Sequence, residues 1–160
     1  MMSKNKEKAK KICFACSSGG HTEQIMMLKP LMKKYDSFLV TEKTQYALNA
    51  GDEKTYYLVQ SNRKEKKLIF VLIWNSILSL RILLKERPDV IITTGVLAII
   101  PLCLLHKIGG GRLIYIESFA KIHSPTLSGK LLYRFADRFY VQWESMLDFY
   151  PKAIYLGGIY

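Results

Sequence analysis

The chain has 160 residues, enough for one domain with its own hydrophobic core. Hydrophobic residues make up 49% of it, which excludes a wholly disordered protein. The three cysteines are too few for a disulfide framework, and without a predicted signal peptide they indicate a reducing, intracellular setting.

The formal net charge of +11 is concentrated in the first half of the chain. Residues 1–87 carry 17 Lys and Arg against 8 Asp and Glu, whereas residues 88–160 carry 7 against 5. A basic half of this kind is typical of proteins that contact an anionic membrane or a nucleic acid. We expect no nucleic-acid binding, because no predicted strand interleaves aromatic and basic residues. Residues 1–10 are polar and basic and predict a flexible head, followed by one domain over residues 11–160.

The rest of the chain predicts strands that alternate with helices. Runs rich in Val, Ile, Phe and Tyr predict strands at Lys11–Cys16, Ser37–Thr41, Thr55–Val59, Val90–Thr94, Arg112–Glu117 and Arg138–Trp143. Helical patterns lie between them at Thr22–Lys34, Leu68–Lys85, Pro101–Lys107, Leu127–Phe135 and Glu144–Tyr150. Pro30 inside the first pattern predicts a kink or an early break. This alternation predicts a single Rossmann-like α/β domain with a mostly parallel sheet.

A glycine-rich corner, residues 17–22 with the sequence Ser-Ser-Gly-Gly-His-Thr, joins the first predicted strand to the first predicted helix. Glycine permits positive φ and a close approach of the backbone to a ligand. Free N–H groups at a helix start favour an anion, typically a phosphate. The corner has neither the G-x-G-x-x-G spacing nor the P-loop lysine, so it is neither known nucleotide motif. A purely structural turn is the alternative interpretation.

Two further polar segments end predicted strands, Thr94-Gly95 and Glu117-Ser118. Because ligands bind at the carboxyl ends of parallel strands, we expect both segments to lie beside the corner. His21 is the candidate general base, since a helix start disfavours the imidazolium; capping the helix or contacting phosphate is its alternative role. Glu117 could accept a hydroxyl proton, orient a sugar hydroxyl or pair with His21, and a salt bridge to Lys or Arg is the alternative.

No metal site is expected. Cys13 and Cys16 have a redox-like spacing, but they lie in a predicted strand on opposite faces, which indicates core residues. The Cys and His residues show no metal-ligand spacing, and the chain contains no Asp-x-Asp pair. His106 and His123 are assigned no role.

The longest predicted helix is also a candidate membrane contact. Its 13 residues Leu68–Leu80 carry no charge, fewer than the roughly 20 that span a bilayer. A basic cluster immediately precedes the helix, which favours an interfacial contact with an anionic membrane. The predicted contact residues are Arg63, Lys64, Lys66, Lys67, Phe70 and Trp74. A helix that covers one face of the sheet is the alternative, and both can hold.

Several segments, taken in chain order, resemble one family. They are residues 17–22, Thr-Thr-Gly at 93–95, Ile-Glu-Ser at 116–118, Leu-Ser-Gly-Lys-Leu-Leu-Tyr at 127–133 and Ala-Asp-Arg-Phe-Tyr-Val-Gln-Trp at 136–143. The chain resembles the accessory, acceptor-half subunits of two-component GT-B glycosyltransferases. These include bacterial subunits that enhance a capsular or exopolysaccharide glycosyltransferase. They also include the membrane-recruiting subunit of the dolichol-linked N-acetylglucosamine transferase.

The resemblance implies the N-terminal, acceptor-binding half of a GT-B enzyme, with the donor nucleotide sugar bound by a separate subunit. The acceptor is then a polyprenyl-pyrophosphate-linked saccharide, and transfer is inverting, without a metal or cofactor on this chain. A non-catalytic membrane scaffold that recruits the true enzyme is the alternative function. The expected location is cytoplasmic, peripheral on the inner face of the plasma membrane.

The resemblance also assigns residues by position. The acceptor and its pyrophosphate would contact Ser17, Ser18, Gly19, Gly20, Thr22, Thr94, Gly95 and Ser118. His21 or Glu117 would deprotonate the attacking hydroxyl. The partner subunit would contact Tyr155, Leu156, Gly157, Gly158, Ile159 and Tyr160.

Overall fold

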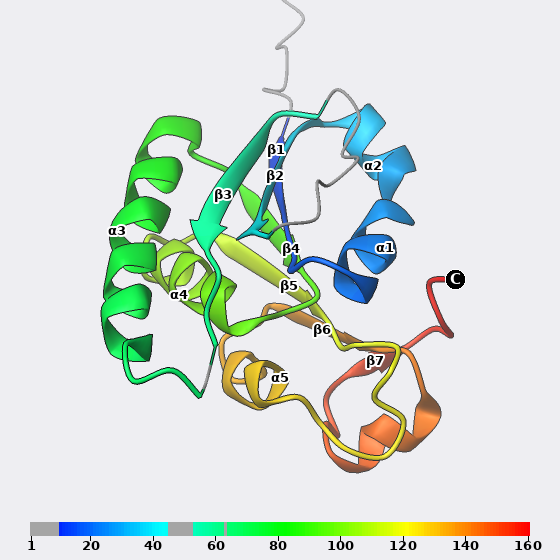
Figure 1. The fold of residues 1–160 in the computed structure, drawn as a ribbon. Coiled ribbons are helices and arrows are strands. Elements are labelled where there is room, and N and C mark those ends of the chain that lie inside the picture. Colours follow the sequence, from blue (N-terminus) through cyan, green and yellow to red (C-terminus); the bar gives the residue numbers. More distant parts are fainter. Residues whose placement is uncertain (1–9, 45–52, 63) are drawn as a thin grey trace, which may run out of the picture.

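The computed structural model describes residues 10–44, 53–62 and 64–160. In this part of the chain one seven-stranded sheet runs in the order β3-β2-β1-β4-β5-β6-β7, with every neighbouring pair parallel (Figure 1). The strands are β1 Lys11–Ala15, β2 Asp36–Lys43, β3 Thr55–Val59, β4 Val90–Thr93, β5 Arg112–Ile116, β6 Arg138–Val141 and β7 Ile154–Tyr155. The predicted Rossmann-like α/β class is confirmed. The predicted head lies outside the described residues, apart from Lys10.

Helices cover both faces of this sheet (Figure 1). They are α1 Gly20–Met26, α2 Lys29–Lys34, α3 Leu68–Glu86, α4 Ile100–Ile108 and α5 Leu127–Leu132, with 3₁₀ turns η1 Leu97–Ile99 and η2 Glu144–Asp148. Side chains of α1 and α2 pack in the core on one face, and those of α3, α4 and α5 pack in the core on the other. The sheet is therefore the middle layer of three.

Several element boundaries differ from those predicted. The break predicted at Pro30 is confirmed, because the pattern over residues 22–34 forms α1 and α2, and Pro30 lies in the first turn of α2. The helix predicted at residues 144–150 is only the 3₁₀ turn η2, and β7 was not predicted because two residues carry no periodicity. Four predicted strands end one or two residues early, which leaves Cys16, Thr94, Glu117 and residues 142–143 outside the ladder.

The core confirms the interpretation of the cysteines. Cys13 packs in the cluster on the α3 face and Cys16 in the cluster on the α1 face, both with no exposed area. Burial raises the pKa of both thiols, that of Cys16 to about 11. Neutral thiols on opposite faces of a strand act as small hydrophobic side chains and not as a redox pair.

The strand order reverses between β1 and β4. From β1 the chain builds outward through β2 to β3, and from β4 it builds the other way through β5 to β7. Neighbouring connections therefore diverge at the carboxyl ends of β1 and β4, which is where open α/β sheets bind ligands. The corner after β1 and the Thr94 segment after β4 lie at this switch point.

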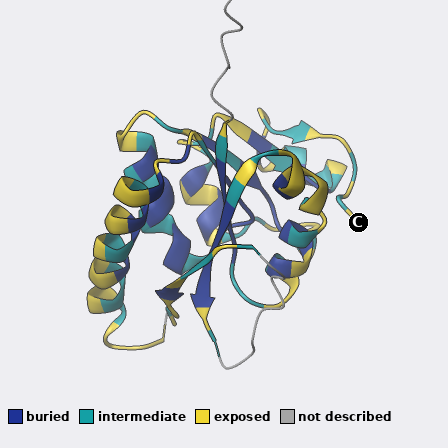
Figure 2. Cartoon of the chain, turned by 90° about the horizontal axis from the view of Figure 1, so that it is seen from above, coloured by how far each residue is buried: buried dark blue, intermediate teal, exposed yellow. Residues whose placement is uncertain are grey.

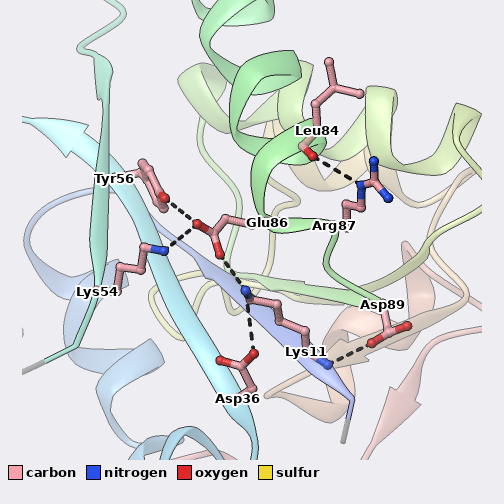
Figure 3. A network of polar contacts seen from close by, with 8 residues as sticks. All are labelled: Lys11, Asp36, Lys54, Tyr56, Leu84, Glu86, Arg87 and Asp89. Atoms are coloured by element: carbon pink, nitrogen blue, oxygen red, sulfur yellow. Dashed lines mark hydrogen bonds and ion pairs between the residues drawn. The ribbon is translucent and has the colours of Figure 1, made fainter. Parts of the chain in front are cut away.

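The opposite, amino edge of the sheet is fastened by a charge network (Figure 3). The carboxylate of Glu86, at the end of α3, contacts the Lys11 and Lys54 ammonium groups at 2.6 Å each and accepts from Tyr56 Oη at 2.5 Å. Burial alone would raise the pKa of Glu86, but these donors outweigh it and lower the pKa to about 2. The network joins the end of α3 to β1 and β3, which are distant from it along the chain.

Candidate functional site

The corner after β1 forms a tight turn with an open side. Gly19 has φ 78°, which favours glycine, and none of the residues that the structure describes comes within 4 Å of the space beside Gly19 or Gly20. Thr22 closes the turn: its hydroxyl donates to the Ser17 carbonyl at 2.5 Å, and its backbone N–H donates to the Gly19 carbonyl at 2.9 Å. Thr22 therefore shapes the corner from within, while the glycines leave its backbone accessible.

The turn after β4 depends on a second glycine. Gly95 has φ 80°, and a Cβ there would lie 2.4 Å from Tyr115 Oη. Its N–H donates to Thr93 Oγ1 at 2.9 Å. Gly95 thus satisfies a backbone requirement and a packing requirement at once, which fixes the Thr94 segment against β5.

His21 belongs to the first of these turns and contacts the second. The Thr94 hydroxyl donates to the His21 carbonyl at 3.5 Å, and the imidazole Nδ1 is buried without a hydrogen-bond partner among the described residues. Burial lowers the pKa of His21, against the opposing charge of Glu117 and the Thr94 backbone. The imidazole is therefore neutral near pH 7, the form that accepts a proton.

Glu117 is fully buried and held by hydrogen bonds. One carboxylate oxygen accepts from the Ser118 N–H at 2.9 Å and the Thr126 hydroxyl at 2.8 Å; the other accepts from Tyr150 Oη at 2.7 Å and the Thr126 N–H at 3.3 Å. These partners are hydroxyl and backbone groups, not the lysine or arginine that the sequence left open. With its lone pairs occupied, Glu117 is placed to organise the start of α5 and acts on His21 through charge.

Two glutamines that the sequence analysis did not identify connect the segments around the site. Gln142 Nε2 donates to Gln24 Oε1 at 2.9 Å and to the Glu117 carbonyl at 2.8 Å. Gln24 Oε1 also accepts from the Phe119 N–H at 3.3 Å. The buried amides tie the first turns of α1 to the loop after β5. Gln142 follows the apolar end of β6, which is a weak signal, whereas Gln24 follows Thr22 and Glu23 and gives none.

Glu42, near the end of β2, is a further acid that sequence reasoning missed. It is 4% exposed and accepts from the Ser61 N–H at 3.3 Å. Burial raises the pKa of Glu42, while hydrogen bonds from Ser61 and Ser17 oppose the change. It therefore lies beside the corner, at the same edge of the sheet as His21. In the described residues, no group of three or more His, Cys, Asp or Glu side chains could hold a metal ion.

The predicted membrane helix α3 has one packed and one open face. Within the described residues it is the one helix with the length and mean hydropathy, 1.9, of a membrane-crossing segment. Asn75, on its inner face, exchanges hydrogen bonds with the Val59 backbone at 2.8 and 2.9 Å. Its outer residues are 40–73% exposed (Figure 2): Ile69, Phe70, Ile73, Trp74, Ile77, Leu80 and Leu84. A helix fixed to β3 in this way fits contact in the membrane plane.

The remaining predicted contact residues divide between surface and groove. Lys64, Lys66 and Lys67 are exposed just before α3, and Arg63 lies outside the described residues. Four of the residues predicted to contact a partner line an apolar groove on the α1 face of the sheet: Leu156, Gly157, Gly158 and Ile159. Leu156 is 80% exposed there, and Tyr160 packs edge-on against Phe119 at 4.9 Å.

Comparison with known proteins decides the family. The pattern of the family described as "Oligosaccharide biosynthesis protein Alg14 like" matches residues 65–159. The chain belongs to the Alg14 family. Among its relatives, the UDP-N-acetylglucosamine transferase subunit ALG14 of Yarrowia lipolytica is 30% identical, over 92% of this chain and 80% of that protein. The subunit of the same name from Homo sapiens is 27% identical, over 92% and 82%.

Solved structures show the fold alone. Acinetobacter baumannii MurG matches with a TM-score of 0.70 at 15% identity, over 85% of this chain and 42% of that chain. UDP-N-acetylglucosamine 2-epimerase from Rickettsia bellii matches with a TM-score of 0.72 at 12% identity, over 95% and 46%. The chain therefore spans under half of each solved protein and has the architecture of one Rossmann-like half of a GT-B protein.

Proposed function

We propose that this chain is the acceptor-binding subunit of a heteromeric glycosyltransferase. The observation that carries the proposal is the meeting of the glycine corner, His21 and the Thr94-Gly95 turn at the switch point of a GT-B-like half. Membership of a family whose relatives are named transferase subunits supports it. The acceptor is a polyprenyl-pyrophosphate-linked saccharide, and the facing donor half comes from a partner subunit.

Pyrophosphate binding is assigned to the open corner. The assigned backbone is that of Ser17, Ser18, Gly19 and Gly20, and among the described residues nothing fills the space beside the two glycines. Thr94 and Gly95 border it from β4, and Thr22 and Ser118 complete the set; all four residues are buried and shape the loops around the corner. The excess of basic residues in the first half of the chain favours a doubly charged lipid headgroup.

We assign to His21 the role of general base, which accepts the proton of the attacking hydroxyl. The attacking hydroxyl oxygen bonds to the anomeric carbon of the sugar, the bond to the nucleotide diphosphate breaks with inversion, and the hydroxyl proton passes to neutral His21. The charge of Glu117 then stabilises the imidazolium. The partner binds the leaving nucleotide, so this chain needs no metal or cofactor of its own.

The cellular setting is part of the proposal. We assign the chain to capsular or exopolysaccharide synthesis, peripheral on the cytoplasmic face of the plasma membrane through α3 and Lys64, Lys66 and Lys67. The partner of this heterodimer contacts residues 155–160, where Tyr155, Leu156 and Tyr160 are exposed.

The test is transfer by the chain with and without its partner. The complex is purified from native membranes and assayed with lipid-linked acceptor and, first, UDP-N-acetylglucosamine, because the relatives carry that donor in their names. We expect turnover only from the complex, and a loss of roughly 100-fold or more for His21→Ala. His123→Ala, at an exposed histidine, is the matched control and should leave the rate unchanged. Full turnover by the isolated chain would refute the half-enzyme assignment.

A non-catalytic scaffold remains the second candidate, favoured by the saturated hydrogen bonding of Glu117. A scaffold holds the partner at the membrane without binding acceptor. Calorimetry with inorganic pyrophosphate distinguishes the two: an acceptor subunit binds it, and His21→Ala or the corner variant Gly19→Val weakens binding. No heat of binding, together with unchanged turnover of the His21→Ala complex, supports the scaffold.

A further inference from the structure

An apolar groove crosses the helical layer formed by α3, α4 and α5. Its volume is about 390 Å³, within the range of about 300–1,000 Å³ typical of ligand pockets. Its lining is Leu72, Ser76, Leu97, Ile100, Pro101, Leu104, Leu105 and Leu131. The one hydroxyl in this lining, on Ser76, is already used, because it donates to the Leu72 carbonyl at 2.8 Å. The groove therefore suits a hydrocarbon and offers little to a polar ligand.

The groove, like the candidate site, has residues close to the carboxyl edge of the sheet. All three helices run back from the carboxyl edge of the sheet, because each follows a parallel strand (Figure 1). Leu97, in the groove, is two residues beyond Gly95, which borders the corner. Along the chain, η1 therefore connects the Thr94-Gly95 turn of the candidate site to the groove.

Charge and exposure around the groove point to a lipid. Lys64, Lys66 and Lys67 lie exposed at the same edge, where they complement anionic headgroups. On α3, the groove residues Leu72 and Ser76 neighbour the exposed residues Ile73 and Ile77. The groove therefore opens beside the face of α3 assigned to the membrane.

We propose that this groove binds the prenyl chain of the acceptor, taking the isoprene units nearest the pyrophosphate. The inference rests on the proposed function and adds the lipid subsite to it. The corner holds the charged end, and the groove holds the first part of the hydrocarbon. The prenyl chain then contributes to affinity directly, besides keeping the acceptor in the membrane.

Soluble prenyl pyrophosphates test this without a bilayer. Binding of inorganic pyrophosphate, geranyl pyrophosphate and farnesyl pyrophosphate to the full chain is measured by calorimetry. We expect affinity to rise with chain length, with farnesyl pyrophosphate binding roughly tenfold or more tighter than pyrophosphate, because more apolar area is buried. Leu131→Trp fills the groove and should abolish this gain while leaving pyrophosphate binding unchanged. Ser76→Met fills it from α3 and should act in the same way.

Ile108→Trp is the control, since Ile108 ends α4 at 83% exposure and lies outside the groove. Equal affinities for the three probes, or a gain that survives in Leu131→Trp, overturn the groove assignment. So does a Leu131→Trp variant that loses only binding to phosphatidylglycerol vesicles, because membrane lipid then occupies the groove. Absence of pyrophosphate binding by the unchanged chain contradicts the proposed function instead, and a gain for farnesyl pyrophosphate over geranyl pyrophosphate still supports the groove.

Discussion

At the scale of single residues, the two candidate catalytic side chains have different environments. Within the described part of the chain, His21 Nδ1 has no hydrogen-bond partner, whereas each oxygen of Glu117 has two donors. A carboxylate that is fully hydrogen-bonded stabilises its surroundings but has little capacity left for substrate. The structure therefore favours a positioning role for Glu117, with its charge felt at His21.

Glu117→Gln separates charge from hydrogen bonding. The Gln side chain places an NH₂ group opposite hydroxyl and backbone N–H donors that Glu117 accepts from. We therefore expect a loss of about 2 kcal/mol in the free energy of unfolding, measured with denaturant. The pKa of His21, followed by NMR, should fall because the neighbouring negative charge is gone. Tyr150→Phe also loses a hydrogen bond but keeps the charge, so it should destabilise the fold without lowering that pKa. An unchanged His21 titration in Glu117→Gln would contradict the coupling.

The ionisation of Glu86 contributes to stability. Its pKa is about 2 in the folded chain and near 4.5 when unperturbed, so its stabilising contribution is complete above pH 4.5 and is lost as the pH falls towards 2. Glu86→Gln should lower the free energy of unfolding at pH 7 by about 2 kcal/mol. The difference from the unchanged chain should shrink below pH 4.5. Glu23→Gln, at an exposed site, is the control; an equal difference at pH 3 and pH 7 would exclude the mechanism.

At the scale of elements, the two faces of α3 differ in character. Its inner face is held by Asn75 on β3 and Glu86 at the amino edge, and its outer face is apolar and exposed. A helix that only covered the sheet would have a polar outer face. The exposed apolar face is therefore the strongest indication that the element contacts another hydrophobic phase.

Replacing Phe70 and Trp74 together by Ser tests that contact. Both side chains are at least half exposed, so we expect little change in folding but a loss of roughly tenfold or more in binding to phosphatidylglycerol vesicles. Phe149→Ser is the control, since Phe149 is 46% exposed beyond η2, away from α3. Equal co-sedimentation of the double variant and the unchanged chain would remove α3 from the membrane assignment.

At the scale of the whole molecule, the amino and carboxyl edges of the sheet have different roles. The amino edge carries the Glu86 network, which joins α3, β1 and β3 (Figure 3). At the carboxyl edge, a glycine with positive φ follows each of β1 and β4. Stability at one end therefore allows an open, glycine-rich site at the other, an arrangement that parallel α/β sheets favour.

Much of this was predictable, for identifiable reasons. Continuous apolar runs give β1, β4 and β5 because both faces of a central strand are buried, and Pro30 predicted the break between α1 and α2. The residues missed were Gln24, Gln142 and Glu42. The local sequence does not distinguish Gln24, which follows Thr22 and Glu23, or Glu42, which lies between Thr41 and Lys43. The role of these residues depends on partners up to 118 residues away.

The sequence by itself determined the order of strands and helices, the glycine corner and the apolar length of α3, because these follow from local periodicity and backbone preference. Only the tertiary structure decided that Glu117 is enclosed by Thr126 and Tyr150, that α3 shows one face to the exterior, and that an apolar groove lies between α3, α4 and α5. These depend on which distant segments pack together. A local pattern limits such packing but does not specify it.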